Sequence, residues 1–389
     1  MITLIRGGEV FAPEPLGRKD LLLAGGVIEA VAEPGRLEVG GGEVETVDAS
    51  GKSVTPGLVD PHVHILGGGG EGGPATRAPE IRIEDIVASG VTTVIGCLGT
   101  DGITRQMTSL LAKARALEIE GVSTFIYSGS YEVPVQTLTG SVRSDLVLID
   151  KVIGAGEIAV SDHRSSQPTF DEIARLAAEC RVGGMLGGKA GILHLHLGDG
   201  RRGLELLFRV VRETAIPVTQ IIPTHASRNP ELFEQALDWV AGGGSIDVTV
   251  GADPAPDETD LRFEEVLAAF DRRGLPLTRL TASSDSNGSL PVFDAAGRLV
   301  RLAVATEADL LRKFQEIVRG GRLPLEAALR VFATNAADFY KLGRKGHIEP
   351  GRDADILVLD GDLGLADVFA RGRRLMADGR LLVRGTFST

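Results

Sequence analysis

The sequence contains few cysteines and few aromatic residues. Of its 389 residues only two are cysteine, Cys97 and Cys180, and 4% are aromatic. Two cysteines cannot build a disulfide framework or a four-thiolate zinc site. Because both lie in apolar stretches, we expect them to be buried packing residues. A chain of this length can bury a large core, which excludes a disordered protein and a small disulfide-stapled fold.

Positive charge and long apolar runs are also scarce. The 41 Lys and Arg residues are outnumbered by 53 Asp and Glu residues, which gives a net charge of −12. This balance argues against a nucleic-acid partner. No stretch approaches the roughly 20 uninterrupted apolar residues of a membrane span, and the opening residues MITLIRGGEVFAPEP lack the apolar core of a signal peptide. We therefore expect a cytoplasmic protein that does not bind membranes.

Glycine, in contrast, is abundant. The chain has 51 glycines, about twice the average usage of roughly 7%. A conspicuous group, Gly67–Gly70 with Gly72 and Gly73, follows the first long apolar strand of the middle region. Glycine permits tight turns and close approach of the backbone to a ligand, so this group predicts a loop at a binding site.

The two ends of the chain share one pattern. Both show short apolar runs broken by Gly and Pro, which is typical of small antiparallel sheets. These runs lie at 2–5, 21–23, 27–31 and 44–47, and again at 354–359, 368–370 and 381–383. We expect residues 1–53 and 344–389 to pair as one small β-sandwich domain.

Residues 54–343 instead alternate β-branched runs with helical segments. One helix is expected at 231–240, with Asn229 as N-cap and Pro230 in its first turn, and Thr169 caps another. The candidate strands lie at 54–65, 91–98, 123–129, 157–162, 191–197, 218–224, 245–250 and 278–285. Eight strands alternating with helices predict an α/β fold of the (β/α)8 TIM-barrel type. A doubly wound open sheet is the alternative, although it usually has fewer strands.

Polar side chains gather where these strands end, which is the catalytic edge of a barrel. His62 and His64 are two residues apart, so on a strand both imidazoles face the same side, and neutral imidazole is a common zinc ligand. A lone pair of this kind is more often a pair of core histidines. Four of the seven histidines lie at strand ends, however, and this concentration predicts a metal site. In strand order the residues are His62 and His64, Thr100, Tyr131, Glu157 with Asp162, His196, His225 and Asp285.

Other motifs have simpler interpretations. His194 shares a face with His196, and only one of the two needs to be a ligand. His163 is expected to support the site through a hydrogen bond, and His347 to lie at the surface. The spacing G-x-x-x-x-G-K at 183–189 lacks the Ser or Thr of a phosphate loop and precedes a strand rather than a helix.

Several motifs together resemble the amidohydrolase superfamily. They are PGLVDPHVH, the strand-end His196 and His225, the SSD that ends in Asp285, TNAA around Asn335, and GHIEPGRDADILVLD. Further segments, spread over nearly the whole chain, resemble the isoaspartyl (β-aspartyl) dipeptidase family within it. They are GGGGEGGPATRAPE, GSYEVPVQTLTGSVR, SDHRSSQP, RVGGMLGGKAG, HLGD, PTHASRN and SSDSNGS.

The resemblance implies a metallo-dipeptidase with two zinc ions per subunit, acting on a small dipeptide substrate. His62 and His64 would bind one metal, and His196 and His225 the other. A metal-bound hydroxide would attack the isopeptide carbonyl of a β-aspartyl dipeptide. Asp285 would contact that hydroxide and act as general base, then as general acid toward the leaving amine.

The resemblance also implies the substrate-binding residues. Glu71 would receive the α-amino group, and Tyr131 would donate a hydrogen bond to the tetrahedral oxyanion. Arg164, Arg228 and Ser289 would hold the substrate carboxylates, a task that suits the planar fork of an arginine. Two further positions would line the same pocket: Gly69 and Thr100.

One position departs from the dipeptidase pattern. Most members carry, on the fourth barrel strand, a lysine that becomes carbamylated and bridges the metals, whereas this chain has Glu157. A carboxylate has the same charge and two oxygens, so we expect Glu157 to bridge the metals without CO2. Because its side chain is shorter, the strand must come closer, the metals must sit differently, or one metal must be weakly held.

Two other functions remain open. Glu157 and the scarcity of aromatic residues are compatible with an amidohydrolase that acts on another amide, such as a cyclic ureide or an N-acyl amino acid. A non-catalytic scaffold on the same fold is the other alternative, but such proteins typically lose the ligand histidines that this chain retains. The family resemblance also favours a homo-oligomer.

Overall fold

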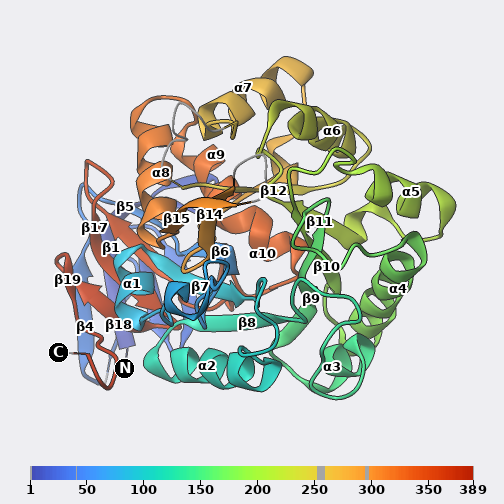
Figure 1. The fold of residues 1–389 in the computed structure, drawn as a ribbon. Helices are drawn as coiled ribbons and strands as arrows, with labels where there is room; N and C mark the ends of the chain where they lie inside the picture. The colour runs from blue at the N-terminus through green and yellow to red at the C-terminus, as the bar shows by residue number, and fades with distance from the viewer. Residues whose placement is uncertain (1, 41, 252–258, 294–297, 389) are drawn as a thin grey trace.

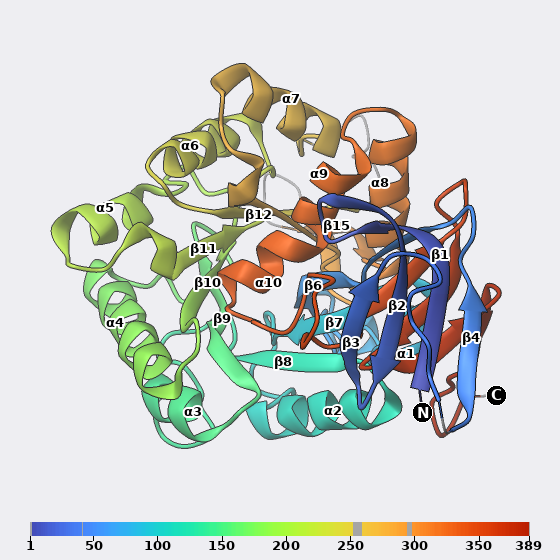
Figure 2. The ribbon, with the colours of Figure 1, turned by 180° about the vertical axis from the view of Figure 1, so that it is seen from behind.

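The computed structural model describes residues 2–40, 42–251, 259–293 and 298–388. The two ends of the chain join in one nine-stranded sheet (Figure 2). Its N-terminal strands are β1 (Ile2–Phe11), β2 (Pro15–Ala24), β3 (Val27–Ala32), β4 (Val44–Asp48) and β5 (Ser53–Pro56). Its C-terminal strands are β16 (Ile356–Leu359), β17 (Leu365–Ala370), β18 (Arg373–Ala377) and β19 (Arg380–Leu381). The antiparallel pairing of β5 with β16 connects the two halves.

This terminal sheet differs from the antiparallel pattern that the sequence predicts. β1 pairs in parallel with both β4 and β5, so the sheet is mixed. The predicted strand at 54–65 is two strands, because the chain leaves the terminal sheet at Gly57. A side chain at Gly57 would collide with Thr92. The sheet buries its own apolar core, which includes Ile5, Leu21 and Phe369.

The middle of the chain forms a parallel sheet in which neighbours in sequence are neighbours in space. Six strands are hydrogen-bonded in order: β6 (Leu58–Val63), β7 (Val91–Gly96), β8 (Ser123–Ser128), β9 (Val152–Val160), β10 (Ile192–Leu197) and β11 (Ile221–Thr224). β12 (Ile246–Thr249) and β13 (Leu280–Ser283) form a separate parallel pair. β12 packs beside β11, and β13 beside β6, where Val63 bridges Ser286. Almost every residue of these strands is buried, as expected for a parallel sheet covered on its faces.

Helices surround the parallel strands (Figure 1). They are α1 (Ile83–Ala88), α2 (Met107–Glu120), α3 (Val142–Leu148), α4 (Phe170–Gly187), α5 (Glu205–Glu213), α6 (Pro230–Ala241), α7 (Phe263–Arg273), α8 (Ala308–Arg319), α9 (Leu325–Leu329) and α10 (Asn335–Phe339). Both predicted helix starts are confirmed. Thr169 and Glu172 form a capping box at α4, and the Asn229 side chain accepts a hydrogen bond from the Leu232 amide at α6. None of the helices in the described ranges is long and apolar enough to cross a membrane.

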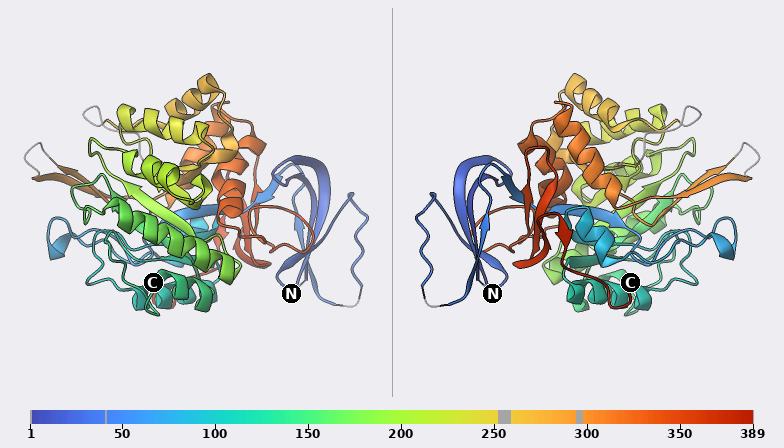
Figure 3. Two further views of the ribbon diagram at one scale, coloured as in Figure 1. Left: turned by 90° about the vertical axis from the view of Figure 1, so that its right-hand side faces the viewer. Right: turned by 90° about the vertical axis from the view of Figure 1, so that its left-hand side faces the viewer.

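Two elements mark opposite ends of the parallel strands. α10 lies at their N-terminal end, where the Asn335 side chain donates hydrogen bonds to the Leu277 and Leu280 carbonyls at the start of β13. At the other end, the hairpin β14 (Ser289–Phe293) and β15 (Leu299–Val304) projects away from the molecule. Figure 3 shows this hairpin on the side away from the N-terminal strands of the terminal sheet.

Candidate metal centre and substrate pocket

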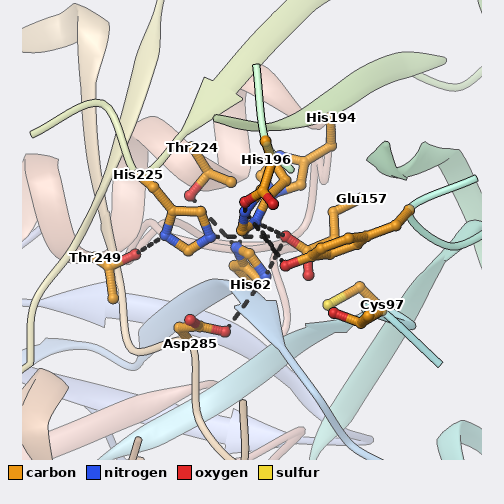
Figure 4. A network of polar contacts seen from close by, with 12 residues as sticks. His62, Cys97, Glu157, His194, His196, Thr224, His225, Thr249 and Asp285 are labelled. Carbon is orange, nitrogen blue, oxygen red and sulfur yellow. Dashed lines mark hydrogen bonds and ion pairs between the residues drawn. The ribbon is translucent and has the colours of Figure 1, made fainter. Parts of the chain in front are cut away.

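Glu157 is surrounded at the carboxyl ends of the parallel strands by His62, His64, His196 and His225. Figure 4 shows this cluster and labels its members except His64. The Glu157 Oε1 atom lies 3.3 Å from His64 Nε2. Its Oε2 atom lies 3.3 Å from His62 Nε2, 3.1 Å from His196 Nδ1 and 3.7 Å from His225 Nε2. The carboxylate is therefore shared by all four imidazoles, which come from β6, β10 and the end of β11.

Asp285 follows β13 and closes the cluster on the side of His62 and His64. Its Oδ1 atom lies 3.0 Å from His64 Nε2 and 3.6 Å from His62 Nε2. The backbone of Asp285 has a φ of 53°, and that of His225 a φ of 57°, values that non-glycine residues seldom adopt and that concentrate at functional sites. A side chain at Gly288 would collide with the Asp285 carboxylate, so glycine is needed there.

The backbone of β9 is irregular where it carries Glu157. The strand extends over Val152–Val160, earlier than the predicted 157–162, so Glu157 lies within it rather than at its end. Its register with β10 shifts between Leu193 and Leu195, opposite Gly156 and Glu157. Gly156 has a φ of 152°, and a Cβ there would lie only 2.7 Å from the His194 carbonyl oxygen. The backbone of β9 thus departs from regular pairing with β10 at Glu157, the residue whose short side chain reaches the histidine cluster.

The cluster has the properties of a metal site. Among the residues that the structure describes, His62 Nε2, Glu157 Oε1 and Asp285 Oδ1 are buried without a hydrogen-bond partner. Such atoms are costly unless something satisfies them, and imidazole nitrogen with carboxylate oxygen is a donor set that zinc favours. Two groups of potential ligand atoms share Glu157. They are His62, His64, Cys97 and Glu157, and Glu157, His196 and His225.

The electrostatics of the cluster point to a cation. Burial alone would lower the pKa of His62, but the electrostatic interactions with Glu157, Cys97 and Asp285 outweigh it and raise that pKa well above its usual range. Burial favours the neutral form of Glu157, yet His62 and His196 hold its pKa well below the usual range. His62 and Glu157 thus stabilise each other's charged forms, and metal cations would supply the positive charge in place of the imidazole.

The second nitrogens of His62 and His225 are held from behind the cluster. His194 Nε2 lies 3.4 Å from His62 Nδ1, and the His194 ring stacks on Tyr127. His225 Nδ1 lies 2.8 Å from Thr249 Oγ1. Metal-binding histidines commonly use their second nitrogen in this way. His194 therefore lies behind the cluster, and the assignment of His196 rather than His194 as a ligand stays a prediction.

A pocket of about 700 Å³ opens above the cluster. Its lining includes ten of the thirteen residues expected at the site: His64, Gly69, Thr100, Tyr131, Arg164, His196, His225, Arg228, Asp285 and Ser289. His163 also lines it, although the supporting hydrogen bond expected of that residue stays a prediction. Gly69 has a φ of 78°, and a Cβ there would lie 2.6 Å from the Thr76 carbonyl oxygen. The glycine-rich loop therefore packs closely at the pocket, as predicted.

Glu71 is not among the residues that line this pocket, but it contacts three of them and keeps one carboxylate oxygen unpaired among the described residues. Its Oε1 atom accepts hydrogen bonds from Thr100 Oγ1 at 3.1 Å and Ser289 Oγ at 2.8 Å, and it lies 3.4 Å from Arg164 Nη1. Its Oε2 atom is buried without a partner in the described part of the chain. One oxygen therefore fixes the side chain and the other is free to accept a ligand hydrogen bond.

Asp162 holds Arg164 in place. The Arg164 Nε and Nη2 atoms donate to Asp162 Oδ1 and Oδ2 at 3.0 and 2.8 Å, and Asp162 Oδ2 lies 3.0 Å from His196 Nε2. One carboxylate therefore connects the arginine to the histidine cluster. Arg228 is less constrained, with its Nη1 atom 3.9 Å from Asp162 Oδ2.

Tyr131 is positioned as a hydrogen-bond donor. Its hydroxyl lies 2.9 Å from His196 Nδ1, and its ring lies 5.4 Å from the Arg164 guanidinium. Burial, together with the negative charge of Glu157, raises the pKa of Tyr131 well above its usual range. The phenol therefore keeps its proton.

Cys97 is a buried packing residue, as predicted, and belongs to a hydrophobic cluster with Val59, Ile95 and Tyr127. Its Sγ atom also lies 3.8 Å from His64 Nδ1 and 4.0 Å from His64 Nε2. The available signal for this proximity was its place at the end of the predicted strand 91–98, next to the strand that carries His62 and His64. Cys180 is buried in α4 as expected.

Comparison with known proteins agrees with this site. The model of the amidohydrolase family matches residues 261–382. A solved structure, β-aspartyl dipeptidase from Fervidobacterium islandicum AW-1 in complex with a β-Asp-Leu dipeptide, is 47% identical with a TM-score of 0.92, and the match covers 100% of both chains. The chain belongs to the amidohydrolase family. Within that family it is similar over its full length to β-aspartyl dipeptidase.

More distant relatives have other activities. Adenine deaminase of Halalkalibacterium halodurans is 24% identical over 378 residues, which is 94% of this chain and 55% of that protein. The chain therefore spans about half the length of this relative. The structure of dihydropyrimidinase from Brevibacillus agri NCHU1002 is 16% identical with a TM-score of 0.68, covering 100% of both chains. At this identity the likeness is one of fold.

Proposed function

We propose that the protein is a metal-dependent dipeptidase that hydrolyses β-aspartyl dipeptides. The observation that carries the proposal is the 3.4 Å separation between Glu71 Oε1 and Arg164 Nη1 at the pocket above the histidine cluster. A β-aspartyl residue keeps its free α-amino and α-carboxylate groups on one carbon. An anion beside a cation matches that pair, and the 47% identical relative was solved with a dipeptide of this class.

The metal ions would be held by residues of the cluster. We assign His62 and His64 to one zinc ion, His196 and His225 to a second, and the Glu157 carboxylate to both. Bound zinc lowers the pKa of a water molecule toward ~7 and polarises a carbonyl group. The eight parallel strands then serve as a (β/α)8 barrel over residues 54–343, with residues 1–53 and 344–389 forming the β-sandwich domain.

The chain supplies proton transfer and charge stabilisation. Asp285 Oδ1 is buried, has no hydrogen-bond partner within the described ranges and faces the pocket, so it can accept the proton of the attacking water. The same carboxyl group then returns a proton to the leaving amine. The Tyr131 hydroxyl, which keeps its proton, donates a hydrogen bond to the developing oxyanion.

The charged groups of the β-aspartyl residue are recognised by charged side chains. Glu71 Oε2 accepts the α-ammonium group, and Arg164 pairs with the α-carboxylate of the same residue. Arg228 and Ser289 complete the binding of carboxylates, while Gly69 and Thr100 shape the wall. An α-aspartyl dipeptide places its free carboxylate on a different carbon from its amine and fits this arrangement less well.

The test compares isomeric substrates. Zinc-loaded protein should hydrolyse β-Asp-Leu, while α-Asp-Leu and an uncharged cyclic amide should be poor substrates. The Asp285→Asn variant should lose about 10²–10⁴-fold in kcat, the range of general acid–base catalysis. Absence of turnover on several β-aspartyl dipeptides, with Asp285→Asn indistinguishable from the unmodified protein, would refute the proposal. Preference for the cyclic amide, unaffected by Arg228→Met, would favour another amidohydrolase activity.

A further inference from the structure

Cys97 lies in the layer of side chains that surrounds Glu157. It directly follows β7, the strand next to β6, and its side chain is 1% exposed. The ligand atoms of Cys97, His62, His64 and Glu157 all lie within 4.8 Å of one another. Figure 4 shows the Cys97 sulfur on the Glu157 side of the cluster. A fourth donor atom is therefore available where the sequence predicts only two histidines and a carboxylate.

Unpartnered atoms independently indicate that this group surrounds a ligand. His62 Nε2 and Glu157 Oε1 are fully buried, and neither has a hydrogen-bond partner in the part of the chain that the structure describes. Both belong to the group of ligand atoms that contains Cys97 Sγ. The backbone after β7 is also held close, because a Cβ at Gly99 would lie 2.8 Å from His64 Cε1. A side chain at position 99 would therefore displace the His64 imidazole.

We propose that Cys97 is a metal ligand, binding through its thiolate the ion held by His62 and His64. The inference rests on the proposed metal-dependent function and adds a residue to its site. A thiolate supplies a third negative charge beside Glu157 and Asp285, closer to balance with two divalent cations. It also makes the donor set softer, which favours zinc over magnesium or manganese.

Cys180 provides an internal control. It is also fully buried, but it lies in α4 within the apolar core, and burial raises the pKa of its thiol far above the usual range. A substitution at Cys180 therefore removes a sulfur without altering the cluster. The two cysteines of the chain can be told apart by single replacements.

X-ray absorption at the zinc edge of the fully loaded protein tests the inference directly. We expect a sulfur scatterer at about 2.3 Å, the usual zinc–thiolate distance, beside nitrogen and oxygen scatterers at about 2.0–2.2 Å. The Cys180→Ser variant should keep the sulfur scatterer and Cys97→Ser should lose it. With cobalt in place of zinc, the near-ultraviolet sulfur-to-metal charge-transfer band should follow the same pattern.

Each outcome decides the question. Full metal loading with nitrogen and oxygen scatterers only, or a charge-transfer band unchanged in Cys97→Ser, would overturn the inference while leaving the proposed function intact. Failure to bind any metal would overturn both. If Cys97→Ser does not fold, the spectrum of Cys180→Ser decides, because Cys97 is then the sole cysteine.

Discussion

Buried carboxylates in the terminal sheet and at the mouth of the parallel strands differ in the groups that surround them. In the terminal sheet, Asp20 is 1% exposed, and its two oxygens accept hydrogen bonds from the Gly7 and Gly35 amides, both at 2.8 Å. At the mouth, Glu157 and Asp285 are buried as deeply, yet each keeps an oxygen without a hydrogen-bond partner among the described residues. Asp20 is thus satisfied by backbone amides, and Asp367, which also keeps one oxygen unpartnered, is paired with Arg374. The unpartnered oxygens of Glu157 and Asp285 instead lie among histidines, where they are available to a ligand.

Replacing Glu157 by Ala should have the largest effect, and that effect should be on metal binding. Breaking a buried ion pair costs about 3–5 kcal/mol, and Glu157 would compensate two cations. We therefore expect metal binding to be weaker by about 10²–10⁴-fold, measured by elemental analysis and metal titration. Two fully bound metals in this variant would show that Glu157 is not a bridge.

The same residue gives a second readout. Because no carbamate has to form on Glu157, metal-free enzyme should recover its activity when zinc is added without bicarbonate. A strict requirement for bicarbonate in this reconstitution would contradict the assignment.

In the terminal sheet we expect a large effect on stability and none on the chemistry. Phe369 is fully buried in the core of that sheet, so Phe369→Ala should lower the free energy of unfolding by about 3–5 kcal/mol. Denaturant unfolding followed by circular dichroism measures this. Phe387, which is 96% exposed, is the matched control and should tolerate the same change. An altered KM in Phe369→Ala would mean that the two regions are coupled.

Arg164→Met should weaken substrate binding without loss of metal. Hydrogen bonds to charged groups contribute about 1.5–3 kcal/mol, which corresponds to a rise in KM of roughly 10–100-fold. Arg209→Met removes an arginine that pairs with Glu213 on the surface of α5 and should leave KM unchanged. Equal behaviour of the two variants would remove Arg164 from substrate recognition.

The smallest expected effect concerns a helix start. Thr169→Ala removes the capping box of α4 and should cost about 1 kcal/mol of stability, whereas Thr169→Ser should restore most of it. Thermal unfolding of the pair provides the measurement. A change in metal content in either variant would argue against a purely local effect of the cap.

Local patterns were sufficient to predict many elements. Strand periodicity placed His62 and His64 on one face, and the residues before α4 and α6 identified both caps. The terminal sheet was harder, because the parallel pairing of β1 with β4 and β5 depends on partners some forty residues away in the chain. The irregular backbone of β9 at Glu157 and the short distance between Cys97 and His64 both depend on how neighbouring strands pack. The sequence of a single strand does not encode that packing. The family resemblance predicts a substrate-binding role for residues such as Glu71, which no pattern in the chain marked.

Anomalous scattering at the zinc edge from crystals of the zinc-loaded protein would show directly how many metals the histidine cluster holds. We expect two anomalous peaks flanking the Glu157 carboxylate, one beside His62 and His64 and the other beside His196 and His225. A single peak, or none within the histidine cluster, would contradict this expectation.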